Sequence, residues 1–356
     1  MLNAVGAGQH LKDHVQPIED ILVVDGRPYD GLKRGGPGPD QLHFDRREIS
    51  PEDDGEALGY MAENRWTRVA LAKAAEEAGL TVFAPARASH MEPDVTPGRN
   101  RLVLESGETL EAPLIVGCDG KFSGLRAQAG VRTTDYAYNQ KAVVLTVEHE
   151  HSHEGVAYEC FMPTGPFAIL PLPGNRSSLV WCERPKAADA LKDMDDAGFQ
   201  EALEARFGDF LGWVKPVSPR WTYPLTLKFA ERFTDDRLAL VGDAAHVIHP
   251  LAGQGINLGL LDAAVLAEEL GRARAAGLPV THATILARYE RRRRADNLLM
   301  QNAMRGFKLL FERPEPAVRW LRNTGLGLVN RLAPARHAFM HRALGRAGDL
   351  PRNARP

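Results

Sequence analysis

The spacing of apolar side chains changes several times along this chain. Residues 65–78 repeat them at helical spacing, and Gly79 follows at the position of a helix C-cap, which predicts a helix that ends there. Residues 114–117 and 238–241 are continuously apolar, as strands of a buried parallel sheet are. Between residues 141 and 184 short apolar runs alternate with Gly, Pro and Asn, and this rhythm predicts an antiparallel sheet.

The antiparallel region divides into four strands, and further elements lie on either side of it. Its strands are predicted at residues 142–147, 156–161, 167–172 and 178–182. Before it, strands are expected at 18–24, 41–44, 81–84 and 102–104, the first two joined by a loop rich in glycine and proline. After it come a helix near 187–207, a strand at 221–229 and, beyond residue 241, a nearly all-helical end.

This order of elements predicts an α/β fold, in which a parallel-sheet nucleotide-binding lobe is interrupted by an antiparallel lobe and followed by a helical tail. The first lobe is assigned residues 1–16, 61–130 and 236–290, the second residues 17–60 and 131–235, and the tail residues 291–356. Ligands of open parallel sheets bind outside the carboxyl ends of the strands. Residues directly after the two continuously apolar strands are therefore the first candidates for a binding site.

The composition of the 356 residues is ordinary for a globular protein, with 44% hydrophobic and 25% charged residues. The formal net charge of −2 gives no argument for nucleic acid as a partner. Cys118, Cys160 and Cys182 form no CxxC pair, which favours reduced thiols over a disulfide framework. No apolar run reaches the roughly 18 to 20 residues of a membrane span, and the first residues lack a signal-peptide pattern. These features predict a cytoplasmic protein.

The first motif covers residues 238–257, where an apolar strand runs through Gly-Asp-Ala-Ala-His and a glycine-rich loop into a helix. The strand brings Asp243 to the mouth of the sheet, where a carboxylate can accept a hydrogen bond from a polyol hydroxyl. The glycines let backbone approach a flat ligand, and the helix directs its free amides and positive dipole end at that ligand. The candidate binding residues are Gly242, Asp243, Pro250, Gly253, Gln254, Gly255 and Asn257. The alternative is a connection whose glycines serve only tight turns.

The second motif covers residues 116–126 and again follows an apolar strand. Asp119 and Gly120 form a tight turn, Ser123 can cap the next helix, and Arg126 offers a cation near the path of a phosphate. Turns of this kind are common by themselves. The presence of both motifs in one chain makes a nucleotide-like ligand the stronger interpretation.

Together these strings resemble the Asp-Gly and Gly-Asp signatures of the class A flavoprotein monooxygenases, the group with the para-hydroxybenzoate hydroxylase fold. Residues 158–161, 165–173, 178–182 and 249–262 are further similar to the ubiquinone-biosynthesis hydroxylases of the 2-octaprenyl-6-methoxyphenol hydroxylase type. The similarity extends from about Leu2 to at least Gly271. It implies that the first lobe binds FAD and that the antiparallel lobe binds the substrate.

The resemblance implies an FAD-dependent monooxygenase that hydroxylates the ring of a prenylated phenol in ubiquinone biosynthesis. In that family NAD(P)H reduces the FAD, dioxygen adds at the flavin C4a position, and the hydroperoxide transfers one oxygen to the phenol. A small aromatic, prenylated substrate is the expected partner, with a ubiquinone-biosynthesis complex as a further one. Two other readings stay open: a hydroxylase of another aromatic substrate, and an inactive truncated paralogue that acts as a complex partner.

By match to the family motif, Asp243 would bind the ribityl chain, and Pro250 with residues 253–257 would line the isoalloxazine. Asp119, Gly120 and Arg126 would belong to the dinucleotide-binding face. Asn64 and Arg65, at the start of the early helix, are further candidates for flavin contacts. No acid–base residue is assigned, because the ring activates itself once its phenol is deprotonated.

The first residues depart from the family pattern. A member is expected to open with an apolar strand, a GxGxxG turn and a helix, whereas Gly6-Ala-Gly8 is followed by Gln9-His10-Leu11. We therefore interpret the chain as N-terminally truncated by at least one βαβ unit of roughly 30 residues, through a late start codon or as a fragment. The first strand of such a fold lies mid-sheet, so a neighbouring strand is expected to be unpaired and FAD to bind poorly.

Two histidine patterns are weaker. Asp243, His246 and His249 have a metal-like spacing, but Pro250 breaks a regular helix there and no fourth ligand is near, so no metal site is predicted. The histidines within residues 149–153 alternate with acidic and polar residues, which favours a solvated hairpin end.

Two basic stretches lie near the C-terminus. Arg291–Arg294 are expected on the exposed side of a helix. Residues 313–356 hold nine arginines and two acids, so 9 − 2 = +7, with apolar side chains between the charges. Such a segment can lie peripherally on the inner face of an anionic membrane, or pack as a helix with a charged outer face; both readings stay open.

Overall fold

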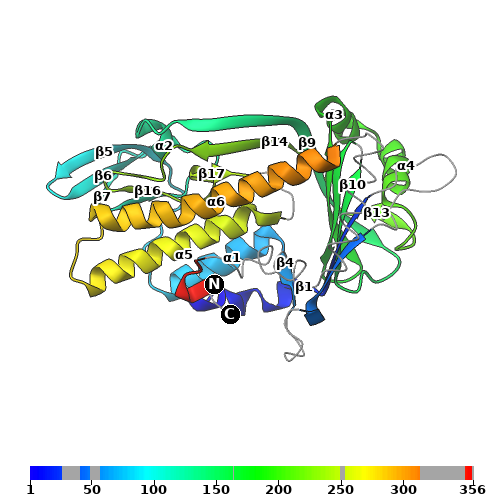
Figure 1. Cartoon of the computed structure of the whole chain (residues 1–356), viewed down its shortest axis with the longest axis horizontal. Coiled ribbons are helices and arrows are strands. Elements are labelled where there is room, and N and C mark those ends of the chain that lie inside the picture. The colour runs from blue at the N-terminus through cyan, green and yellow to red at the C-terminus, as the bar shows by residue number, and fades with distance from the viewer. Residues whose placement is uncertain (26–40, 49–56, 163, 249–252, 313–348, 355–356) are drawn as a thin grey trace.

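Strands and helices alternate along the chain in this computed structural model, as the predicted α/β class requires (Figure 1). The structure describes residues 1–25, 41–48, 57–162, 164–248, 253–312 and 349–354. Within these ranges the strands form four sheets, one of nine strands, two of three and one of two.

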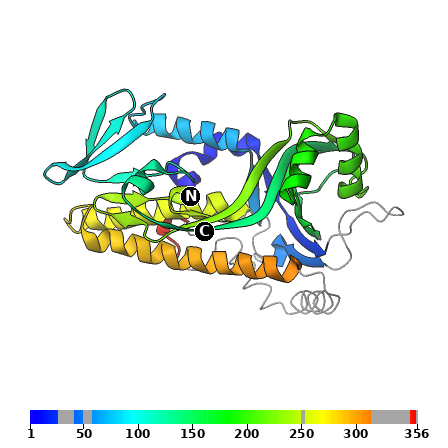
Figure 2. The same cartoon turned by 90° about the horizontal axis from the view of Figure 1, so that it is seen from above.

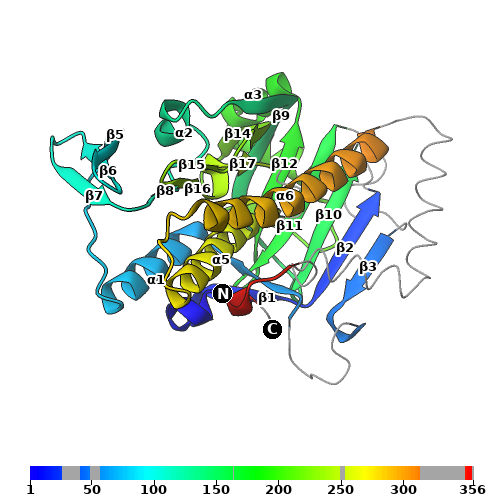
Figure 3. The same cartoon turned by 60° about the vertical axis from the view of Figure 1, so that its left-hand side comes forward.

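The nine-stranded sheet is the antiparallel lobe that the sequence predicts, and Figure 3 shows its strands side by side. Across the sheet they are β17 (His246–Val247), β14 (Trp221–Ala230), β9 (Thr133–His149), β12 (Arg176–Glu183), β11 (Gly165–Leu172), β10 (Val156–Met162), β2 (Asp20–Asp25) and β3 (Gln41–Asp45), while β13 (Val214–Pro216) pairs with β9. The strands expected at 18–24, 41–44 and 221–229, and the four expected between residues 142 and 182, are thereby confirmed. One pairing, between β2 and β10, is parallel.

One face of this sheet is covered by α3 (Pro185–Asp193) and α4 (Asp196–Phe207), as Figure 1 shows. A single helix over 187–207 was expected, but the chain breaks at residues 194–195. The break arises because Asp195 caps a new helix, accepting a hydrogen bond from the Gly198 amide at 2.8 Å. Apolar residues of both helices, among them Phe199 and Phe207, pack with the facing strands into one buried cluster.

The parallel sheet is small. It consists of β15 (Thr234–Asp235), β16 (Leu238–Leu240) and β8 (Ile115–Gly117), and β16 and β8 run parallel as the two apolar runs predict. Within the described ranges β8 pairs on one side only, with β16. Val116 of this strand is 39% exposed.

The other three-stranded sheet contains β5 (Ala88–Thr96), β6 (Arg99–Leu104) and β7 (Thr109–Ala112). It includes the strand expected at 102–104, whereas the strand expected at 81–84 is wrong. Residues 81–84 belong to no strand or helix, and Val82 is 66% exposed. Apolar character alone does not make a strand, because its backbone groups need a neighbour.

The early helix is confirmed as α1 (Asn64–Glu77), and the left-handed Gly79 follows its end. It packs on the N-terminal turns, where His14 stacks on Trp66 at 3.7 Å between ring centroids. The remaining short elements are β1 (Val15–Ile18), β4 (Gly59–Ala62), η1 (Asn3–Val5), η2 (Gly8–His10), η3 (Lys12–His14), η4 (Arg46–Glu48), η5 (Gly242–Ala244), η7 (Arg352–Ala354) and α2 (Gly124–Gln128).

Two long antiparallel helices complete the arrangement, α5 (Gln254–Ala275) and α6 (Ala283–Glu312). They lie on the side of the large sheet opposite α3 and α4, and the long strands β9 and β14 extend toward them (Figure 2). Helix α6 continues without a break through the boundary expected at residue 290. Among the described residues, no helix is long and apolar enough to cross a membrane.

Candidate cofactor-binding site

The two sequence motifs meet at the carboxyl ends of β8 and β16. Gly117 lies opposite Leu240, and the Val241 amide donates to the Gly117 carbonyl at 3.0 Å. A side chain at position 117 would crowd Leu240, since an added Cβ would lie 3.1 Å from its Cδ2 atom. Asp119 and Asp243 follow these paired positions by two and three residues, so the structure brings both carboxylates to one end of the sheet.

The loop after β8 is organised by its own polar side chains. Asp119 accepts a hydrogen bond from the Leu125 amide at 3.2 Å, and Gly120 takes the left-handed conformation with φ +80°. Ser123 accepts from the Arg126 amide at 3.0 Å and caps α2, as predicted.

Arg126 connects the two motifs. Its guanidinium donates to the Ala244 carbonyl at 2.7 Å and to the Lys121 carbonyl at 2.9 Å, and the residue is only 7% exposed. The sequence suggested a cation near a phosphate; the structure shows this side chain inside the protein, holding the loop after β8 against the turn after β16.

That turn lies against helix α5. Gly242 has φ +60°, and its Cα lies 3.2 Å from where a Cβ on Gly259 would be. Gly259 is therefore needed for the helix to pass this close to the turn, while Gly242 is needed for the left-handed conformation of the turn itself. Sequence reasoning identified Gly242 but not its partner in the helix, although both stand in the same motif.

Asp262 of α5 is the centre of a buried polar network behind the turn. Its carboxylate accepts from the Gly242 amide at 3.0 Å and lies 2.6 Å from His246 Nε2. The Nε atom of Arg293 on α6 donates to it at 2.7 Å. Asp262 is fully buried, and His246 and Arg293 are each 1% exposed. His246 is thus bound to a carboxylate, and its Nδ1 atom is buried without a partner.

The network decides the charge of Asp262. Burial favours the neutral acid, but the hydrogen bond from His246 and the charge of Arg293 outweigh it and hold the pKa of Asp262 below its usual range. The expectation that Arg291–Arg294 all face solvent is wrong for Arg293. It follows Tyr289 by four residues and precedes Asn297 by four, so helical periodicity puts all three on the buried stripe of α6.

Asp243 differs from Asp262 because it stays partly exposed at the end of the sheet. Burial raises the pKa of Asp243, against the opposing charges of His246 and Lys121. Within the described residues its side chain forms no hydrogen bond, so its oxygens can accept from a ligand hydroxyl. Lys121, which the sequence analysis did not single out, places a cation near the same carboxylate.

The N-terminus of α5 supplies the second half of the site. Gly253 precedes the helix with φ +62°, and no side chain caps the first amides, which are those of a 22-residue helix. Gln254, Gly255 and Asn257 occupy its first turn, where the dipole favours negative charge. Pro250 lies outside the described residues.

Asn64 and Arg65 are placed separately, at the exposed start of α1. Arg65 is paired with Glu63 at 2.8 Å and lies over the ring of Trp66. In the described ranges neither residue has a hydrogen bond or ion pair with the strand-end motifs. Their role as flavin contacts stays a prediction.

The histidines of residues 149–153 are not a solvated hairpin end. His149 is 1% and His153 7% exposed, and both rings are hydrogen-bonded, His149 to Ser177 at 3.0 Å and His153 to the Leu172 carbonyl at 2.8 Å. The reason for the difference is that the chain turns back between β9 and β10 and encloses both rings. Only His151 of the three lies exposed.

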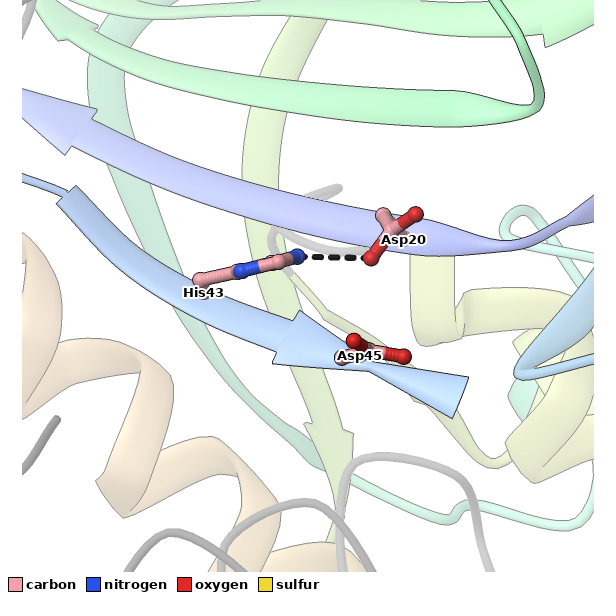
Figure 4. A group of neighbouring side chains, drawn as sticks. All are labelled: Asp20, His43 and Asp45. Carbon is pink, nitrogen blue, oxygen red and sulfur yellow. Dashed lines mark hydrogen bonds and ion pairs between the residues drawn. The ribbon is translucent and has the colours of Figure 1, made fainter. Parts of the chain in front are cut away.

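One group of possible metal ligands occurs at the edge of the large sheet, where Asp20, His43 and Asp45 lie close together on β2 and β3 (Figure 4). His43 Nε2 lies 2.6 Å from Asp20. Both Asp45 oxygens accept hydrogen bonds from the guanidinium of Arg47, at 2.9 and 2.6 Å. An ion pair therefore already uses the carboxylate, and the group is explained without a metal.

Comparison with known sequences gives consistent matches. The chain matches the FAD binding domain family over residues 32–302. The ubiquinone hydroxylase UbiL of Rhodospirillum rubrum is 45% identical over 346 residues, which cover 97% of this chain and 77% of that protein. The 3-demethoxyubiquinol 3-hydroxylase of Escherichia coli is 37% identical over 291 residues, which cover 81% of this chain and 73% of that protein.

Solved structures share the fold. The p-nitrophenol 4-monooxygenase PnpA from Pseudomonas putida superposes with a TM-score of 0.77 at 17% identity, covering 97% of this chain and 86% of that one. HpxO of Klebsiella pneumoniae, in complex with FAD, gives 0.71 at 15% identity, covering 96% and 86%. The predicted fold class is confirmed by these likenesses.

Proposed function

This chain belongs to the FAD binding domain family and is an FAD-dependent monooxygenase, and we propose that it hydroxylates an aromatic ring of a prenylated phenol in ubiquinone biosynthesis. The observation that carries the substrate class is the 45% identity, over 97% of the chain, to a relative named as a ubiquinone hydroxylase. The 3-demethoxyubiquinol 3-hydroxylase supports the same pathway. FAD, when bound, supplies the oxygen chemistry of this family.

The residues at the strand ends fit FAD. We assign Asp243 to the ribityl hydroxyls, because the residue is partly exposed and its carboxylate accepts no hydrogen bond from the described residues. The uncapped N-terminus of α5 suits the electron-rich edge of a reduced flavin, since its amides and dipole stabilise negative charge there. Further residues assigned to the cofactor are Gly242, Pro250, Gly253, Gln254, Gly255, Asn257, Asp119, Gly120, Asn64 and Arg65.

Other residues of the site act by positioning. Arg126 and Asp262 both bind the turn after β16, one from α2 and one from α5, and so fix where Asp243 stands. We further propose a division into two lobes. Residues 1–16, 61–130 and 236–290 bind FAD, and residues 17–60 and 131–235 hold the phenol against it. NAD(P)H is the proposed electron donor. Residues 313–356 are proposed to contact the inner membrane face, where a prenylated substrate resides.

The proposal is tested with the purified chain supplied with FAD. A flavin absorbance spectrum that survives desalting establishes the cofactor. Substrate is then tested by NADH and NADPH oxidation in the presence of a short-chain prenylphenol, with the product identified by mass spectrometry. A hydroxylated prenylphenol is the expected product, whereas flavin-loaded protein that hydroxylates only unprenylated aromatics would assign it another substrate class.

A further inference from the structure

One carboxyl group lies on the inner face of the large sheet among apolar neighbours. Glu159 of β10 lies opposite Val23 of β2 and Ala168 of β11. Residues opposite each other in neighbouring strands point to the same side of a sheet, and so do residues two apart in one strand. Ala157 and Phe161, two positions before and after Glu159 in β10, therefore lie on the same face as Glu159. Together with Val23 and Ala168 they are its four nearest neighbours on that face, and all four are apolar.

This face is the one turned toward the cofactor lobe. The same row of paired residues continues from Ala168 through Val180 of β12 to Val144 of β9. Val180 and Val144 pack against the cluster that contains residues of β16, α5 and α6. The opposite face packs against α3 and α4. Figure 1 shows α5 and α6 on the inner side of the sheet, with the N-terminal end of α5 toward it.

Among the described residues, Glu159 has no partner for its charge. No hydrogen bond or ion pair of its side chain occurs in the described part of the chain. Burial raises the pKa of Glu159 to about 8, and no charged group contributes to this shift. The residue as a whole is nevertheless only partly buried. A polar group that is deep, unpartnered and still reachable is suited to a ligand that brings its own hydrogen-bonding group.

We infer that Glu159 faces the aromatic substrate and takes the proton of its phenolic hydroxyl. This inference rests on the proposed function, which supplies the phenol. In the step the O–H bond of the phenol breaks and an O–H bond to the carboxylate forms. The electron pair stays on the phenolate oxygen, so the ring becomes more electron-rich where oxygen is transferred.

The unusual environment makes this transfer feasible. A phenol has a pKa of about 10 and an ordinary glutamate about 4.3, so transfer between them is uphill by almost six pKa units. A pKa of about 8 for Glu159 removes more than half of this difference in pKa between the glutamate and the phenol. Proton acceptors work best when their pKa lies near that of the donor and the operating pH.

The first test concerns the carboxyl itself and needs neither FAD nor substrate. Because its folded pKa is raised above the unfolded value, the glutamate opposes folding more strongly as pH rises from about 4.3 toward 8. We expect Glu159→Gln to raise the melting temperature relative to wild type at pH 9, and by much less at pH 5. The matched control is Glu148→Gln on β9, whose carboxylate is paired with Lys215 at 2.8 Å and whose side chain is 40% exposed; this variant should show no such rise. An equal pH dependence in both variants overturns the inference.

The second test uses 4-nitrophenol, whose absorbance separates phenol from phenolate, with the FAD-supplied chain. We expect the probe bound to wild type to ionise at a lower pH than the probe bound to Glu159→Leu, because the protonated carboxyl donates back to the phenolate. Identical ionisation in both proteins overturns the inference. Both proteins must bind the probe at one site. The comparison then does not depend on which substrate the enzyme hydroxylates.

The third test is turnover. With a substrate that wild type hydroxylates, Glu159→Gln should lower the rate about 10²-fold or more, the usual contribution of a positioned base, with KM little changed. The wild-type rate should rise with pH through about 8, and the variant should lose this rise. A variant with unchanged rate and pH profile overturns the inference. If wild type hydroxylates no phenol, the proposed function fails, while the nitrophenol measurement still judges Glu159.

Discussion

The substitution Asp262→Asn tests the buried network that holds the turn after β16. In the wild type the carboxylate receives hydrogen bonds from the Gly242 amide, His246 and Arg293, at 3.0, 2.6 and 2.7 Å. Asparagine keeps the volume of the side chain but removes its charge and turns one acceptor into a donor. It would leave the guanidinium of Arg293, which is 1% exposed, with only the ion pair to the partly exposed Asp296 at 2.9 Å.

The expected magnitude follows from that burial. Removing one partner of a buried ion pair costs about 3–5 kcal/mol when the remaining charge is left unpaired. Because Arg293 keeps its pair with Asp296, we expect the lower end of this range. A folded domain has a free energy of unfolding of only about 5–15 kcal/mol. The variant should therefore lose a large part of its stability. The Gly242 amide and Arg293 donate to different oxygens of the carboxylate, so asparagine, with one oxygen, leaves one of them without an acceptor. The turn is therefore held less firmly, and FAD binding should weaken as well.

The assay is urea unfolding followed by circular dichroism, with midpoint and slope compared between wild type and variant. The control is Asp189→Asn, which removes the same charge from the pair with Lys141 at 2.6 Å. Asp189 is 47% exposed, so this change should cost at most about 1 kcal/mol. The reasoning is refuted if both substitutions cost the same, or if Asp262→Asn and Arg293→Met have strictly additive effects, since coupled pairs deviate by about 0.5–3 kcal/mol.

The pH dependence gives a second check on the same network. The pKa of Asp262 is lower in the folded than in the unfolded chain, so its contribution is complete above the unfolded value of about 3.9 and is lost as pH falls through the folded value. The stability difference between wild type and Asp262→Asn should therefore shrink below about pH 4.

Three further predictions concern the surroundings of the turn. Gly259→Ala should lower the free energy of unfolding in urea by about 1–3 kcal/mol, because its Cβ would lie 3.2 Å from the Gly242 Cα. The control Gly271→Ala, in the same helix, places its Cβ in open space and should raise stability by up to about 1 kcal/mol. Equal effects of the two substitutions would contradict the close approach. A thiol reagent should label the exposed Cys118 in the native chain, and FAD should slow this labelling if it binds at the strand ends. Arg126→Met should cost about 1–3 kcal/mol by leaving the buried Ala244 carbonyl and the part-buried Lys121 carbonyl unpaired, seen as a lower urea midpoint; an unchanged midpoint would argue against that role.

The parts of this fold that could be predicted from the sequence are those with strong local signals. The apolar runs at 114–117 and 238–241 became the parallel strands β8 and β16, and the alternating region between 141 and 184 became antiparallel strands. In each case burial on one or both faces sets the pattern of apolar residues. The run at 81–84 shows the limit of this reasoning, because a strand also needs a partner that local sequence does not name.

The contacts of the site could be predicted where both partners belong to one sequence motif. They could not be predicted where the partners are far apart in the sequence. Ser123 caps the helix that begins one residue later, so the pattern predicts the contact. The hydrogen bond from Arg293 to Asp262 spans 31 positions and joins two helices. A run of four arginines predicts a solvated helix face. Only the spacing to neighbouring apolar residues such as Tyr289 indicates which of the four points into the protein.

The same argument explains why a proton acceptor was not assigned from the sequence. Glu159 stands between Tyr158 and Cys160. Alternation along β10 predicts that Glu159 points to the opposite face of the sheet from these two residues, but it does not predict which face the helices cover. That choice depends on α3 and α4, which follow some 25 residues later and pack on the side of Cys160. Once they occupy that side, Glu159 must face the cofactor lobe. The chemistry of this position is therefore set by packing between distant segments, and a substitution that loosened α3 or α4 should also disturb the environment of the carboxyl.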